Sequence, residues 1–212
     1  MPPVIPNPAN IHEFASEADF ERWLAKHHAT ASEIWIKVHK KGSGLATVST
    51  TEALDVALCW GWIDAIRKSL NGTSFLQRYT PRTKKSIWSI INTEHVARLI
   101  KAERMQLPGH AQIEAAKADG RWEKAYAGSK TMVAPDDLKS AIHASSKARA
   151  MYDTLTSQNR YALAFRLMNI KTEAARKRNI AAFVAMLARG ETFYPNKGTL
   201  RAAAKRAAKT AT

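Results

Sequence analysis

The sequence predicts an α+β fold, in which a small antiparallel β-sheet packed by helices occupies the N-terminal half and the C-terminal half is all helical. Three observations support this fold class. Residues 34–39 alternate apolar and polar side chains, as a strand does. Two more such runs flank Asn71-Gly72, a dipeptide typical of a hairpin turn. From residue 86 onward, apolar residues recur at helical spacing between capping residues.

The expected elements follow in chain order. Ser16 and Asp19 form a capping-box pattern that starts a helix over 17–28, and Ser49 or Thr50 caps a helix over 51–61. A type I′ turn at the hairpin tip would require positive φ at Gly72. Strands are expected at 33–40, 63–70 and 74–81. Further helices are expected at 94–103, 109–118, 136–142, 146–154, 158–168 and 172–187.

The chain of 212 residues is long enough for one large domain with a helical appendage. We expect four parts in order. A flexible proline-rich N-terminus covers 1–11, an α+β core domain covers 12–130, and a C-terminal helical region covers 131–190. A basic tail over 191–212 should be disordered, because its alanine- and lysine-rich sequence offers no apolar face to bury.

Composition indicates a cytoplasmic protein. No apolar run approaches the roughly 20 residues that span a bilayer, and the N-terminus lacks the pattern of a signal peptide. The single cysteine, Cys59, lies in an apolar run and suits a reducing compartment as a buried, inert thiol. The net charge is +15, and residues 165–212 hold eleven basic and only two acidic groups. Such a field attracts polyanions, although a solvated tail that only aids solubility is equally compatible with it.

Residues 57–92 carry the strongest signal for a binding site. Tryptophans, arginines and hydrogen-bonding side chains gather there among apolar residues, a combination that suits a small anionic or polar ligand. A helix beginning near Ser86 would add free amides that attract an anion. The alternative is that the same residues form core and helix caps, with Asp64 buried opposite Arg78 or Arg82. The candidate ligand-binding residues are Trp60, Trp62, Asp64, Tyr79, Arg82, Ser86, Trp88, Ser89 and Asn92.

A second hypothesis is sequence-nonspecific binding of nucleic acid by the basic C-terminal helix and tail, since no base-reading module is recognisable. Its candidate residues are Lys171, Arg176, Lys177, Arg178, Arg201, Lys205 and Arg206. An enzyme is the third hypothesis. Asp64, Arg82, Ser89 and Asn92 supply suitable groups, but no nucleophile–base pair emerges from the spacing, so no catalytic residue is assigned. The histidines show no metal-binding pattern, and no cofactor motif is present, so neither metal nor cofactor is expected.

A set of short motifs occurs in a fixed order along the chain: Trp23-Leu24 with His28, Ile34-Trp35-Ile36, Trp60-Gly61-Trp62-Ile63-Asp64, Tyr79-Thr80-Pro81-Arg82, Trp88-Ser89 with Asn92, Gly120-Arg121-Trp122, and Arg176. Their order and spacing resemble those of the YdeI/OmpD-associated family, also described as bacteriocin-protection proteins. The similarity runs over most of residues 12–190. Where the family usually has glycine after Trp-Ile-Asp, this chain has Ala65.

The resemblance implies a bacterial protein with a non-enzymatic role in stress or antimicrobial tolerance. The family name also implies association with an OmpD-type porin. Combined with segment 57–92, it favours a protein that binds a small anionic or polar ligand, ahead of nucleic-acid binding and ahead of an enzyme.

Overall fold

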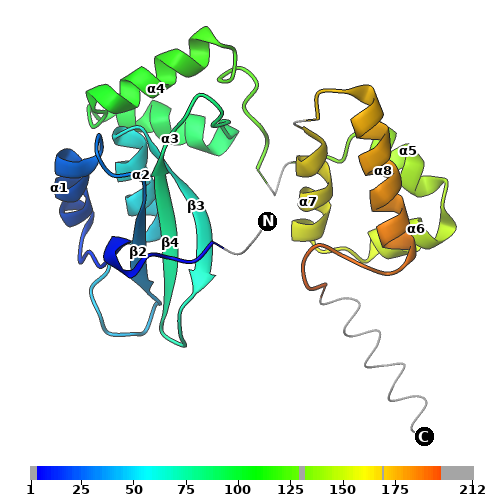
Figure 1. Cartoon of the computed structure of the whole chain (residues 1–212), viewed down its shortest axis with the longest axis horizontal. Coiled ribbons are helices and arrows are strands. Elements are labelled where there is room, and N and C mark those ends of the chain that lie inside the picture. Colours follow the sequence, from blue (N-terminus) through cyan, green and yellow to red (C-terminus); the bar gives the residue numbers. More distant parts are fainter. Residues whose placement is uncertain (1–3, 129–131, 169, 197–212) are drawn as a thin grey trace, which may run out of the picture. The chain divides into compact units, whose positions relative to one another are not determined.

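A computed structural model describes residues 4–128, 132–168 and 170–196 of the chain (Figure 1). The chain divides into two compact units, Met1–Tyr126 and Ala127–Thr212. The first unit is α+β and the second is helical, so the predicted fold class is confirmed. The N-terminal unit contains a short 3₁₀ turn, Pro8–Asn10, followed by β1 (Ile11–His12), α1 (Glu17–His27), β2 (Ile34–His39), α2 (Thr50–Cys59), β3 (Trp62–Ser69), β4 (Ser74–Pro81), α3 (Ile90–Lys101) and α4 (Leu107–Ala118).

The sheet has the strand order β1-β2-β4-β3. β2 pairs antiparallel with β4, and β4 with β3, as predicted, while β1 adds a parallel pair that the sequence pattern did not reveal. A bulge shifts the β3–β4 register between Asp64 and Arg67. Ala65 lies in this bulge without positive φ, so the absence of the family's glycine leaves the backbone unstrained there.

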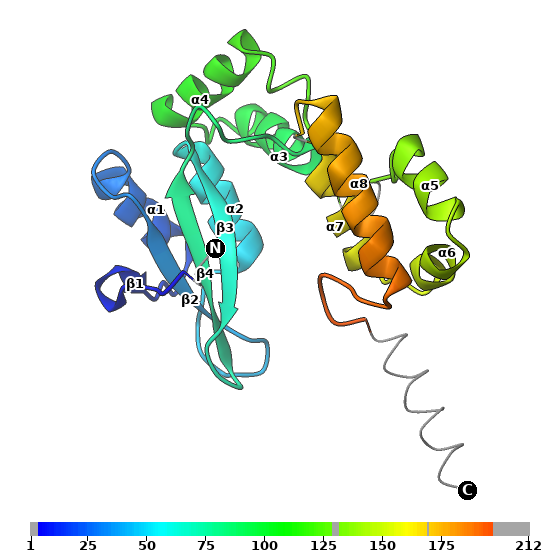
Figure 2. The same cartoon turned by 45° about the vertical axis from the view of Figure 1, so that its right-hand side comes forward.

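Two helices cover one face of the sheet, and Figure 2 shows α2 lying along it. Phe20 and Leu24 of α1 and Val56 of α2 pack with Ile34 and Ile36 of β2 in one buried cluster. Both helices begin with a capping box. The one at Ser16 was expected from the sequence, and the one at Ser49 selects between the two predicted N-caps, Ser49 and Thr50. The alternation of β2 therefore supplies the apolar face that these helices cover.

A second cluster lies among α2, α3 and α4, where Leu58 and Trp88 pack with Leu99 and Ile113. The α4 backbone comes unusually close to the end of α2. A Cβ atom on Gly109 would lie 2.2 Å from the carbonyl oxygen of Cys59. Only a glycine allows this approach, so Gly109 fixes the contact between the two helices.

The C-terminal unit has its own core. Its helices are α5 (Asp136–His143), α6 (Ser146–Asp153), α7 (Ser157–Met168) and α8 (Glu173–Ala188). Leu138 and Ile142 of α5 pack with Leu163 of α7 and with Phe183 and Leu187 of α8. Asn196 closes this unit, since its side chain bonds the Thr154 carbonyl and the Thr156 amide. Residues beyond 196, which hold most of the predicted basic tail, lie outside the described part.

The structure differs from the sequence predictions at two points. The hairpin loop does not use positive φ at Gly72. Instead the Asn71 side-chain oxygen accepts bonds from the amides of Thr73 and Ser74, which closes a longer loop. The helix expected over 94–103, with Thr93 before it as the cap, begins earlier, at Ile90. Its N-cap is Ser89, whose hydroxyl accepts from the Asn92 amide.

Candidate functional site

A polar pocket of about 240 Å³ opens in the N-terminal unit beside the bulge of β3. Its walls come from the first turns of α2, from β3 and β4, and from α3. Most of the lining groups are polar or charged, in contrast to the two apolar clusters beside them. The lining residues are Thr50, Thr51, Leu54, Asp64, Arg67, Gln77, Tyr79 and His95.

The β3 bulge places Arg67 in this pocket. Its Nε donates to the Gln77 side-chain oxygen at 2.9 Å, and its guanidinium carbon lies 4.5 Å from the centre of the Phe75 ring. Both partners are on β4, so the hydrogen bond and the ring fix the direction of the guanidinium group. Neither partner is a carboxylate, so the positive charge of Arg67 is available to an anionic ligand.

His95 of α3 is held by a buried carboxylate from α2. Its Nδ1 lies 2.7 Å from an oxygen of Asp55, and Arg98 donates to both Asp55 oxygens at 2.7 Å. Burial alone would raise the pKa of Asp55, but the hydrogen bonds from Arg98 and His95 outweigh it and hold that pKa below its ordinary value. Because Asp55 is only 6% exposed, the arrangement locks the imidazole orientation.

Asp64 and Tyr79 are cross-strand partners at the inner wall. Asp64 as a residue is exposed on β3, yet its carboxyl group faces the pocket, and desolvation there raises its pKa. The charges of Arg82 and Arg67 oppose this shift. Among the described residues no cation lies within ion-pair distance of Asp64. Tyr79 is 1% exposed, and burial followed by the charge of Asp64 raises the pKa of its hydroxyl.

The tryptophans of segment 57–92 belong to the core instead. Trp62 is 1% exposed, and its indole nitrogen donates to the His28 carbonyl at 3.2 Å. Trp88 is 2% exposed and packs against the Trp122 ring at 4.8 Å. Trp60 caps the end of α2, is partly buried, and contacts the His28 ring at a tilted angle. None of these three side chains lines the pocket.

Arg82 is buried beside Trp88. It is 4% exposed, its guanidinium carbon lies 3.4 Å from the Trp88 ring centre, and its Nη1 donates to the Ile87 carbonyl. Its Nε and Nη2 have no partner among the described residues. Burial lowers the pKa of Arg82 to about 10, although the charge of Asp64 acts in the opposite direction. Arg82 is thus a buried cation behind the pocket rather than part of its surface.

The remaining predicted residues have local roles. The Ser86 hydroxyl accepts from the Thr83 amide, and Ser89 caps α3. The Asn92 amide is the partner of that cap, and its side chain is not part of the pocket lining. The structure therefore brings together only Asp64 and Tyr79 of the nine predicted ligand-binding residues.

The C-terminal basic residues that the structure describes fall into two groups. Arg176 binds Asp137 of α5 at 2.5 and 3.0 Å and also the Leu167 carbonyl, and Lys177 pairs with Glu173 at 2.6 Å. Lys171 and Arg178 are exposed. The other predicted residues, Arg201, Lys205 and Arg206, lie outside the described residues.

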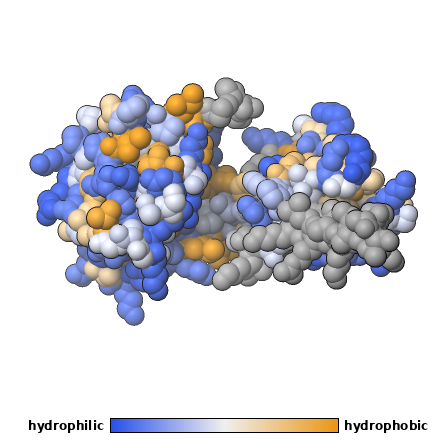
Figure 3. All heavy atoms as spheres, turned by 90° about the horizontal axis from the view of Figure 1, so that it is seen from below, coloured by the Kyte–Doolittle hydropathy of each residue, from blue (hydrophilic) through white to orange (hydrophobic). Residues whose placement is uncertain are grey.

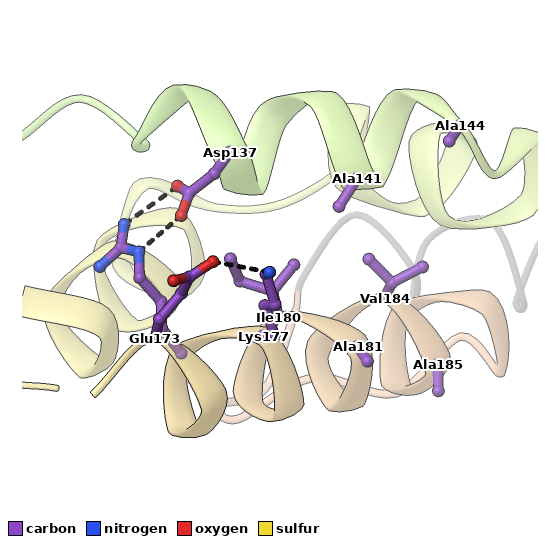
Figure 4. Close-up of a pocket in the computed structure, with 10 residues that line it drawn as sticks. Asp137, Ala141, Ala144, Glu173, Lys177, Ile180, Ala181, Val184 and Ala185 are labelled. Atoms are coloured by element: carbon purple, nitrogen blue, oxygen red, sulfur yellow. Dashed lines mark hydrogen bonds and ion pairs between the residues drawn. The ribbon is translucent and has the colours of Figure 1, made fainter. Parts of the chain in front are cut away.

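These ion pairs border a groove of about 720 Å³ between α5 and α8. Figure 4 shows Asp137 on α5, with Glu173 and Lys177 on α8, at one end of the groove. Ala141 and Val184 line it farther along. Because Arg176 spans the two helices, its first role is to join α5 to α8.

Sequence reasoning missed Arg67, Gln77 and His95. Arg67 lacked a signal because a bulge, which the sequence did not indicate, determines its direction. His95 had one usable signal. It lies three residues before Arg98 on a helix, so both side chains lie on the same face and can share one acidic partner. That partner, Asp55, is forty residues away and is found only from the packing of α2 on α3.

The fold and pocket define an α+β unit with a small polar cavity, followed in the chain by a helical unit with its own core. Residues 12–112 match a family described as a domain of unknown function (DUF8412). Residues 131–190 match the family described as "Bacteriocin-protection, YdeI or OmpD-Associated". Over residues 131–190 the resemblance predicted from the sequence is confirmed. No curated protein and no solved structure matches the chain.

Two further observations concern the described residues. They contain no helix that is both long enough and apolar enough to cross a bilayer. On the face in Figure 3 the surface is mainly hydrophilic, and the hydrophobic patches on it are small and separate.

Proposed function

We propose that the N-terminal unit binds a small anionic or polar ligand in the pocket between β3, β4, α2 and α3. The observation that carries this proposal is that two groups in the pocket lining, Arg67 and His95, are each held in a fixed orientation by neighbouring side chains. Arg67 is held by Gln77 and Phe75, and His95 is held by Asp55. Side chains fixed in this way lose little conformational entropy when a ligand binds. The volume of about 240 Å³ lies below the roughly 300–1,000 Å³ of drug-sized sites, which favours a small metabolite.

The cellular role that we propose is bacterial stress or antimicrobial tolerance. Its support is the family match over residues 131–190. In this proposal the pocket recognises a small molecule and the protein catalyses no reaction.

A direct test measures binding of lactate, glycine and inorganic phosphate by titration calorimetry. Arg67→Ala should abolish binding of any probe that the wild type binds, because the fixed guanidinium group is lost. Arg78→Ala is the matched control. This arginine also lies in the sheet, but it pairs with Glu33 away from the pocket. Absence of binding for all three probes, or equal loss in both variants, would contradict the proposal.

A further inference from the structure

The charges around Asp64 are unbalanced in a way that bears on what the pocket binds. The group of β3 that acts on Asp64 is Arg67. Tyr79 of β4 and Arg82, the residue after β4, also act on it. From α2 and α3 the groups are Asp55, His95 and Arg98, of which Asp55 and Arg98 form a close pair. Asp64 is therefore the one acidic group near the two cations, Arg67 and Arg82, that have no carboxylate partner among the described residues.

The protonation state of Asp64 determines how well the pocket accommodates an anion. When Asp64 is ionised, an anion in the pocket meets a like charge on the same wall. When Asp64 is protonated, its carboxyl group becomes a hydrogen-bond donor in a lining that also contains its cross-strand partner Tyr79 and, from the same strand, Arg67. Desolvation, which raises the pKa of Asp64, lowers the cost of the protonated state.

We infer that the pocket takes up a small carboxylate together with one proton, and that Asp64 holds the proton. The bound carboxylate then supplies the negative charge that Asp64 has given up, so the arginines keep one anionic neighbour in both states. The hydroxyl groups of Thr50 and Thr51 favour a carboxylate that also carries a hydroxyl group. This inference rests on the proposed function and deepens it by naming the ligand class.

The test is titration of the full chain with lactate between about pH 5 and 8. Above the pKa of Asp64 the affinity should fall about tenfold per pH unit, because each lactate must bring one proton. Calorimetry in two cationic buffers of different ionisation enthalpy should show uptake of about one proton per lactate.

Two variants separate the candidate proton sites. Asp64→Asn mimics the protonated carboxyl group, so it should bind lactate without this pH slope and without proton uptake. His95→Gln should keep the wild-type slope. A slope that disappears in His95→Gln but persists in Asp64→Asn would overturn the inference, since the proton would then reside on the imidazole.

The remaining outcomes distinguish the inference from the proposed function. Lactate binding with the same affinity at all pH values would overturn the proton coupling and leave the pocket as a ligand site. Methylammonium binding that strengthens as the pH rises would show that ionised Asp64 recognises a cation, and it would overturn the carboxylate assignment. If the wild type binds neither probe, nor glycine, nor phosphate, the proposed function itself fails.

Discussion

Replacing Gly109 by alanine tests the close contact between α4 and α2. In most helices this change stabilises a protein by about 0.5–1 kcal/mol, because glycine loses more backbone entropy on folding. Here the new Cβ would lie 2.2 Å from the Cys59 carbonyl oxygen and 2.9 Å from its carbon. The Cys59 oxygen also accepts a hydrogen bond from the Gln106 amide at 3.1 Å, which restrains it.

The clash should outweigh the entropic gain. Overpacking of this kind costs roughly 1–3 kcal/mol, and the backbone contact at this position favours the upper part of that range, so the net loss should reach about 2 kcal/mol. For a protein of this size each kcal/mol lowers the melting temperature by about 2–4 °C. Tryptophan fluorescence is a suitable readout, since all six tryptophans lie within Met1–Tyr126 and report that unit alone.

Gly72→Ala is the matched control. Gly72 has open space around its Cβ position and no positive φ, so alanine there should be neutral or stabilise by about 0.4–1 kcal/mol. If Gly109→Ala melts at or above the wild-type temperature, the contact between α4 and α2 is looser than the structure indicates and the reasoning is refuted.

Three further outcomes are expected. Trp62→Ala should lower the unfolding free energy by about 3–5 kcal/mol, since it empties a fully buried site and leaves the His28 carbonyl without its donor; a loss under about 1 kcal/mol in urea unfolding would contradict this. Arg82→Met should leave the stability nearly unchanged, whereas Arg82→Ala should lower it. Methionine fills the space of a buried cation whose Nε and Nη2 have no partner among the described residues. Equal melting temperatures for the two variants would argue against this reasoning. Asp64→Asn should stabilise the protein at neutral pH and have no effect below the ordinary pKa of aspartate. The reason is that the pKa of Asp64 is raised in the folded protein, so the wild type loses stability as the pH rises from the ordinary value through the raised one. Parallel stability–pH curves for the two proteins would disprove this.

Local signals predicted most of the elements. Strands expected at 63–70 and 74–81 are Trp62–Ser69 and Ser74–Pro81, and the N-caps Ser16 and Ser49 start helices close to where they were expected. Such features depend on neighbours a few residues apart, which a sequence displays directly. The start of α3 was misplaced because Ser86, Ser89 and Thr93 all favour an N-cap, and only packing of Trp88 in the core selects among them.

The candidate site was less predictable because it depends on distant partners. Trp62 and Asp64 share one face of β3, yet Trp62 packs with Trp23 of α1 while Asp64 borders the pocket. A count of aromatic and charged residues cannot make that distinction. Arg82 presented the same difficulty, since a guanidinium group near tryptophans suggests a ligand site as strongly as it suggests the buried stacking that the structure shows.

The bulge in β3 also bears on how molecules of this protein behave in concentrated solution. β3 is an edge of the sheet within the described residues, and Ile66 is exposed on it. A regular edge offers a row of free amides and carbonyls to a strand from another molecule, which is a route to aggregation. The irregular register between Asp64 and Arg67, with Lys68 next to it, interrupts that row. Deleting one residue from the bulge should therefore promote self-association of the protein, and it should also turn the Arg67 side chain away from the pocket.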